Sequence, residues 1–179
     1  MTSHVWQSNC RAALRNCMAA FLILIAGSTA AAAGNRHALS APVDLATDGM
    51  QAGLRGTPVV ILFSVSGCSF CDVVRRNYLA PMLRDLPEQK RPVIREVQIN
   101  GNASFSGFHR EQITHRAFAQ RYGARFAPTV VLLDGAGNVL TSPIVGGDTT
   151  GLYGGYLDNA FGEAARKLAS NRRPETSGE

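Results

Sequence analysis

Two cysteines, Cys68 and Cys71, stand three residues apart directly after a long apolar run. The run, residues 59–65, is rich in β-branched side chains and is followed by a Ser-Gly pair, which predicts a buried strand and then a tight turn. Residues 72–83 have the spacing of a helix, so both thiols would lie on its first turn. Side chains at this spacing are neighbours, near the distance that a disulfide bridges. The free N–H groups of that turn would stabilise a thiolate at Cys68.

Two cysteines at this spacing could also belong to a zinc site or form a purely structural disulfide. A zinc site needs at least two further ligands at suitable positions, but no cysteine follows Cys71, and His109 and His115 lack the usual ligand spacing. A purely structural disulfide between residues three apart closes almost no loop and constrains little of the unfolded chain. We therefore favour a redox-active dithiol and expect neither a metal nor an organic cofactor.

The start of the chain has the parts of a secretory signal peptide, which we assign to residues 1–33. Arg11 and Arg15 lie in a segment without acidic residues, residues 18–26 form a short apolar core, and four alanines end at Ala33. This order is typical of a segment removed on export, and the core is too short to span a bilayer comfortably. We expect cleavage near Ala33 and a periplasmic protein. The alternative is membrane anchoring by an uncleaved segment.

Removal of that segment changes both the cysteine content and the charge. Cys10 and Cys17 would be lost, and Cys68 and Cys71 would be the only cysteines of a protein in an oxidising compartment. A single closely spaced pair favours redox chemistry over stabilisation of the fold by disulfides. Without Arg11 and Arg15 the formal net charge falls from +5 to +3. The remaining basic residues are scattered and form no stripe with aromatic residues, so we expect no nucleic acid partner. The sequence does not indicate an oligomeric state.

The rest of the chain alternates between strand and helix patterns. We expect, in order, a flexible lead-in 34–42, a helix 44–54, a strand 59–65, the helix 72–83, a strand 93–99, a loop 100–110, a helix 113–122, a strand 126–134, a returning strand 139–145, a helix 152–168 and a polar tail 169–179. The strand–helix–strand unit requires a parallel pair, and the hairpin adds an antiparallel strand. The fold class is therefore α/β, with a central mixed sheet of about four strands and helices on both faces.

With these elements placed, residues 43–168 resemble the thioredoxin fold. The resemblance depends on the strand that leads into Cys68-Ser69-Phe70-Cys71, on Ala127-Pro128-Thr129 at the start of the next buried strand, and on the hairpin at 134–139. The chain is most similar to the exported, thioredoxin-related thiol–disulfide oxidoreductases of bacteria.

The resemblance implies roles for individual residues. Cys68 would attack a substrate disulfide and Cys71 would resolve the mixed disulfide. Ala127, Pro128 and Thr129 would form the substrate-binding edge, with Pro128 in the cis form. The implied partners are protein thiols and disulfides, and a membrane electron donor or acceptor. The alternative function is a thioredoxin-fold binding protein or a thiol-based metal carrier without redox turnover.

The chain departs from thioredoxins at three places near the dithiol. Leu62 stands where thioredoxins carry a buried acid, Gly67 replaces a tryptophan, and Ser69-Phe70 replaces Gly-Pro. A buried negative charge opposes formation of a thiolate, so its absence at Leu62 stabilises the reduced form. We therefore expect a dithiol that is more oxidising than that of thioredoxin.

Overall fold

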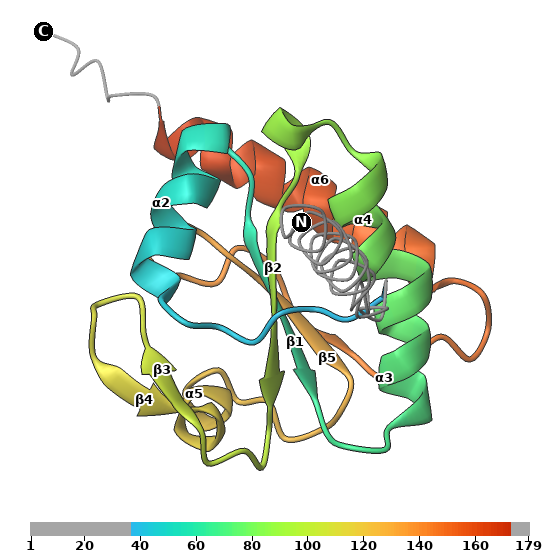
Figure 1. Ribbon diagram of the computed structural model, residues 1–179. Coiled ribbons are helices and arrows are strands. Elements are labelled where there is room, and N and C mark those ends of the chain that lie inside the picture. Colours follow the sequence, from blue (N-terminus) through green and yellow to red (C-terminus); the bar gives the residue numbers. More distant parts are fainter. Residues whose placement is uncertain (1–36, 173–179) are drawn as a thin grey trace, which may run out of the picture. The chain divides into compact units, whose positions relative to one another are not determined.

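The computed structural model describes residues 37–172. The expected signal peptide, residues 1–33, and the last seven residues of the expected tail lie outside this part of the chain. Within it, a four-stranded sheet has the order β2-β1-β5-β6 (Figure 1). The strands are β1 (Val59–Ser64), β2 (Val93–Gln98), β5 (Thr129–Leu133) and β6 (Ile144–Val145).

The pairing of the strands confirms the expected mixed sheet. β1 is parallel to β2, with Val59 opposite Val93. β1 is antiparallel to β5, with Phe63 opposite Thr129, and β5 is antiparallel to β6, with Thr129 opposite Val145. The carboxyl end of β1 therefore lies beside the amino end of β5.

Helices cover both faces of this sheet (Figure 1). The helical segments are α2 (Leu45–Arg55), α3 (Ser69–Val74), a π-helical turn η1 (Arg75–Leu79), α4 (Ala80–Asp85), a 3₁₀ turn η2 (Glu88–Lys90), α5 (His115–Arg121) and α6 (Tyr153–Asn171). α2 and α5 pack on one face, whereas the segments from α3 to α4 pack with α6 on the other. Within residues 37–172, none of these helices is both long and apolar enough to cross a bilayer.

The central strand supplies side chains to two separate cores. Val60 and Leu62 belong to the cluster under α3 and α6, and Val59, Ile61 and Phe63 belong to the cluster under α2 and α5. All five side chains are fully buried. Because full burial of such a side chain contributes about 1.5–3 kcal/mol, the strand that leads into the dithiol is firmly anchored on both faces.

An ion pair joins α2 to β2 on the second of these faces. Arg95 donates from Nε to Asp48 Oδ2 at 2.8 Å and from Nη2 to Asp48 Oδ1 at 2.5 Å. Asp48 is only 5% exposed. A buried carboxylate of this kind requires its partner, since an unpaired buried charge is strongly destabilising.

The expected loop at 100–110 is wrong in part, because it contains a strand. β3 (Ser104–Ser106) pairs with β4 (Gln112–Thr114) in a separate two-stranded sheet. Phe105 anchors this hairpin by packing edge-on against Phe118, with ring centroids 5.2 Å apart. α5 consequently begins at His115 and not at residue 113, and Thr114 caps it by accepting the N–H of Ala117.

Three element boundaries also differ from expectation. The returning strand is reduced to Ile144–Val145 and an isolated bridge at Val139, because Pro143 interrupts the run and has no N–H to donate. α6 continues through Asn171, three residues into the expected polar tail. The expected flexible lead-in is packed where it is described, since Leu39 is buried and the Ser40 carbonyl accepts the N–H of Glu96 at 3.0 Å.

The helix after the dithiol continues past Pro81, although Pro81 predicts a kink or an end there. The interruption takes the form of the π-helical turn, in which the N–H of Ala80 bonds to the carbonyl of Arg75. Pro81 then lies in the first turn of α4, where a missing N–H is tolerated. A continuous helical path therefore runs from Ser69 to Asp85.

Candidate redox-active site

Cys68 and Cys71 form a disulfide at the start of α3, with their Cα atoms 5.2 Å apart. Gly67 precedes them with a φ of +72°, a conformation that favours glycine, and so makes the turn out of β1. Cys68 is the N-cap residue, and its sulfur accepts the N–H of Cys71 at 3.1 Å. Cys68 is partly exposed, whereas Cys71 is fully buried. The two sulfurs thus differ in access to a partner.

The sheet brings the second predicted segment to the same end of the molecule. Thr129 begins β5 opposite Phe63, five residues before Cys68, so Pro128 lies at the edge where β1 turns into α3. The peptide bond between Ala127 and Pro128 is cis. The Thr129 hydroxyl donates to the carbonyl of Phe126 at 2.8 Å, which closes the loop before the strand.

A third segment reaches the dithiol from beyond β6. A Cβ atom at Gly147 would lie 2.8 Å from the Cβ of Phe70, so only glycine allows the backbone to approach this ring so closely. Phe70, between the two cysteines, is nevertheless 50% exposed, and Phe126 is 71% exposed. Two phenylalanine rings therefore face solvent at the dithiol end.

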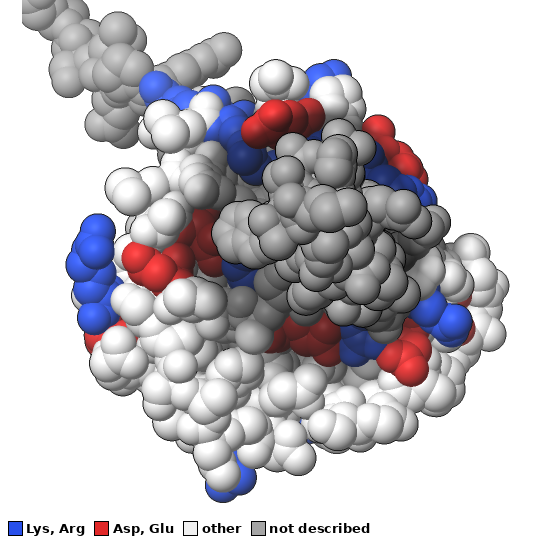
Figure 2. Space-filling view, viewed as in Figure 1, with Lys and Arg blue, Asp and Glu red and all other residues white. Residues whose placement is uncertain are grey.

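The surface around this end carries little charge. The strand and turn from 62 to 71, the segment 126–133 and the segment 139–147 contain no Asp, Glu, Lys or Arg. In Figure 2 charged side chains lie over the upper and left parts of the view and across its centre right, whereas the part below the start of α3 is largely white. A partner that approaches the sulfurs there meets an uncharged surface with exposed aromatic rings.

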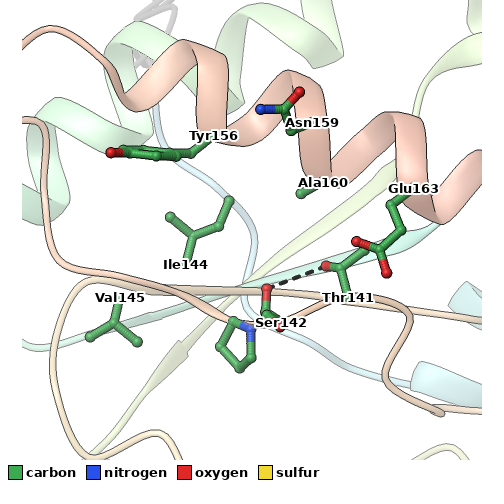
Figure 3. Close-up of a pocket in the computed structure, with 9 residues that line it drawn as sticks. Thr141, Ser142, Ile144, Val145, Tyr156, Asn159, Ala160 and Glu163 are labelled. Carbon is green, nitrogen blue, oxygen red and sulfur yellow. Dashed lines mark hydrogen bonds between the residues drawn. The ribbon is translucent and has the colours of Figure 1, made fainter.

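A groove of about 370 Å³ lies next to this end, between β6 and α6 (Figure 3). Ile144 and Val145 line it from the edge strand, and Tyr156, Asn159 and Ala160 line it from the helix. Val145 is 59% exposed and Tyr156 is 57% exposed. The groove runs along the open edge of the sheet, where Thr141, Ser142 and Glu163 add polar groups to its lining.

A buried polar network beneath the dithiol helix was missed by sequence reasoning. Arg75 donates from Nε to Glu96 Oε2 at 2.9 Å and from Nη2 to Glu96 Oε1 at 2.6 Å. Its Nη1 atom forms a further ion pair with Asp72. Ser64 donates its hydroxyl to Glu96 Oε1 at 2.6 Å and accepts from the side-chain amide of Gln98 at 2.9 Å. The hydrogen bond to Glu96 raises the pKa of Arg75 above its ordinary value.

Part of this network could have been found from spacing. Strand alternation places Glu96 on the same face of the sheet as Ile94, the face that α3 covers. Arg75 follows Cys71 by four residues, which places it on the same helix face. Their direct contact depends on how the helix docks on β2, which periodicity does not specify.

Among residues 37–172, no cluster of three or more His, Cys, Asp or Glu side chains could hold a metal ion. The site consists of a disulfide at a helix start, a proline-led strand beside it, and a surface without charged residues over segments 62–71, 126–133 and 139–147.

This combination of fold and dithiol defines a thioredoxin-fold protein. A sequence profile described as a thioredoxin-like domain matches residues 45–150, more than half of the chain, and the protein belongs to that family. No curated protein sequence matches the chain.

Solved structures with a similar fold include several thioredoxin-fold proteins. A thioredoxin-fold protein from Helicobacter pylori is 14% identical with a TM-score of 0.46, over 69% of this chain and 93% of its own. The oxidised carboxyl-terminal domain of Neisseria meningitidis DsbD is 15% identical with a TM-score of 0.44, over 68% and 99%. A DsbH oxidoreductase is 13% identical with a TM-score of 0.44, over 76% and 94%.

Proposed function

We propose that this protein is a thiol–disulfide oxidoreductase that exchanges electrons with protein thiols and disulfides through Cys68-Ser69-Phe70-Cys71. The observation that carries the proposal is the disulfide between a partly exposed sulfur and a fully buried one at a helix start. A thiolate at Cys68 would keep the N–H of Cys71 as a hydrogen-bond donor, and such a bond to an anion is stronger than one to a neutral thiol. The arrangement therefore favours the nucleophilic form of the accessible cysteine.

The exchange proceeds in two substitutions at sulfur. The Cys68 thiolate attacks one sulfur of a substrate disulfide, so that a Cys68–substrate bond forms and the second substrate sulfur leaves as a thiolate. Cys71 then loses its proton and attacks Cys68, which restores the internal disulfide and releases the first substrate sulfur. Two electrons pass from the protein to the substrate. The same steps in reverse oxidise a substrate dithiol.

We assign substrate binding to Ala127, Pro128 and Thr129. Pro128 has no backbone N–H and so donates no hydrogen bond at this position. Ala127 is partly exposed, and the neighbouring Phe126 ring offers apolar contact. The Pro128 carbonyl already accepts the N–H of Gly146 at 2.8 Å. A substrate segment in extended conformation could therefore pair with the backbone of Ala127 while its cysteine reaches Cys68.

Turnover of a disulfide substrate tests the proposal against a thiol-based metal carrier. We expect the purified protein to reduce insulin disulfides with dithiothreitol as electron donor, and to retain less than about 0.1 zinc or copper per chain after dialysis, because a site with two thiols lacks the further ligands that zinc requires. The rate with bovine serum albumin in place of the protein is the control. Stoichiometric metal without turnover would contradict the proposal.

Equilibration with glutathione measures the reduction potential of the Cys68–Cys71 pair. We expect a potential above about −230 mV, compared with about −270 mV for thioredoxin, because Leu62 places no negative charge beneath the sulfurs. A value at or below that of thioredoxin would instead favour a dedicated reductant, supplied with electrons by a membrane donor.

For location, we propose export to the periplasm with removal of residues 1–33. The support is the order of basic, apolar and small residues that ends at Ala33. Intact mass of the periplasmic protein should correspond to a chain that begins near Gly34. A mass that retains residues 18–26 would favour the membrane-anchored alternative.

A further inference from the structure

An ion pair that the exchange reaction does not use joins the dithiol helix to strand β2. Arg75 follows Cys71 by four residues, and its backbone N–H bonds to the Cys71 carbonyl. The two side chains therefore lie one turn apart on the same face of the helix. Helical side chains lean toward the helix amino end, and the ion pair of Arg75 with Asp72 agrees with that direction. The guanidinium thus extends back toward the turn that carries the sulfurs.

Two carboxylates hold this guanidinium in place. The side chain of Arg75 is 17% exposed and that of Glu96 is 11% exposed, and two hydrogen bonds of 2.6 and 2.9 Å connect them. Ser64 fixes the carboxylate from the other side at 2.6 Å. Because so little water reaches these groups, their charges act on neighbours with less screening than charges on the surface.

The carboxylate also occupies a distinctive place in the sheet. Glu96 is the strand partner of Leu62, so the two side chains lie side by side on the face that α3 covers. A shallow polar pocket above them is lined by His37, Asp72, Arg75 and Arg76. Among the described residues, the charged or titratable groups on this side of α3 are therefore those four and Glu96, which pairs with Arg75.

We infer that Arg75 and Glu96 are positioning residues that set the charge felt by the dithiol, with Glu96 compensating the positive charge of Arg75. The inference rests on the proposed function. When two glutathione thiols reduce the internal disulfide, they form a glutathione disulfide and supply two electrons and two protons. One proton is taken up by Cys71, the other passes to the buffer, and Cys68 remains a thiolate. One negative charge appears, which a nearby cation favours and a nearby anion opposes. The paired charges nearly cancel, so the wild-type dithiol feels little net field from them.

Removing either partner should therefore move the dithiol in opposite directions. Glu96→Gln leaves Arg75 with only Asp72, whose side chain is 55% exposed, as its charged partner. The positive charge is then less completely compensated, and we expect the equilibrium constant for reduction by glutathione to rise about tenfold, or about 30 mV. Arg75→Gln leaves Glu96 and Asp72 uncompensated, and we expect that constant to fall about tenfold. The thiolate absorbance at 240 nm should titrate at lower pH in the first variant and at higher pH in the second. A merely loosened helix would move both variants the same way.

Controls separate charge from packing. Asp48→Asn breaks the other buried arginine pair of β2, on the opposite face, and Glu88→Gln removes an exposed carboxylate. Both should leave the equilibrium constant within about twofold. The double variant Arg75→Met/Glu96→Leu removes two opposite charges and replaces them with apolar groups, a change that is often neutral for stability, and it should also remain within about twofold.

The outcomes are decisive in either direction. Opposite shifts in the single variants, with little shift in the double variant, would support the inference. Shifts of the same sign, no shift in the single variants, or a tenfold shift in the double variant would overturn it. If one single variant does not fold, the sign of the shift in the other decides. Loss of insulin turnover in the wild type would contradict the proposed function, whereas these titrations need no protein substrate.

Discussion

Replacing Cys68 with alanine is expected to abolish exchange with protein disulfides, lowering turnover by at least about a thousandfold, because the nucleophilic sulfur is removed. Replacing Cys71 should lower turnover as strongly but leave the first substitution intact. Cys71→Ala is therefore expected to accumulate mixed disulfides with a substrate, whereas Cys68→Ala should form none. The difference follows from access, since Cys68 is partly exposed and Cys71 is fully buried.

Mass spectrometry of the protein after incubation with a peptide disulfide measures both outcomes. Cys10 and Cys17 are replaced by serine in every variant, so that each adduct maps to one sulfur of the dithiol. A Cys68→Ala variant with a stable peptide adduct on Cys71 would reverse the assigned roles.

Replacing Asp48 with asparagine is expected to lower the free energy of unfolding by about 3 kcal/mol, because the guanidinium of Arg95, whose side chain is 27% exposed, loses the charged partner that Asp48 supplies from a buried position. The carboxylate is 5% exposed and accepts two hydrogen bonds from Arg95. The melting temperature should fall by roughly 10 °C for a domain of this size. Urea denaturation followed by circular dichroism measures the change directly.

An exposed pair on the same helix provides the matched control. Arg55 of α2 lies 3.9 Å from Glu88, whose side chain is 72% exposed. Glu88→Gln should change the free energy of unfolding by less than about 0.5 kcal/mol, as is usual for exposed pairs. Equal losses for the buried and the exposed carboxylate would show that the Asp48 pair does not stabilise the fold as described.

The parts of the fold that were predicted from sequence are those with strong periodicity. The apolar run at 59–65 predicts a central strand. The alternation along 93–99 correctly places Val97 and Glu96 on opposite faces of the sheet. β3 was missed because three residues are too few to establish a period. β6 was predicted too long because apolar residues stand at both ends of 139–145, whereas only Ile144 and Val145 form a ladder with β5.

The two halves of the site differ in how they could be found. Cys68 and Cys71 are visible because their chemistry and spacing are local. The contact between Arg75 and Glu96 joins residues 21 positions apart and depends on the docking of α3 on β2. The contact of Gly147 with Phe70 likewise requires the loop after β6 to fold back across the helix start. Such long-range contacts leave no regular pattern in the sequence.

The register of β1 has a consequence for the order of folding. β1 pairs with β2 at a separation of 34 residues, as between Val59 and Val93, but with β5 at 66 residues, as between Phe63 and Thr129. Closing the longer loop costs more chain entropy, and pairings this distant along the chain slow the formation of a domain. The unit from β1 to β2, with its intervening helix, can therefore assemble before β5 docks. In such an intermediate the dithiol would already lie at its helix start, but the start of β5, to which we assign substrate binding, would not yet be in place. The chemical reactivity of the dithiol would then be established before its selectivity for substrates.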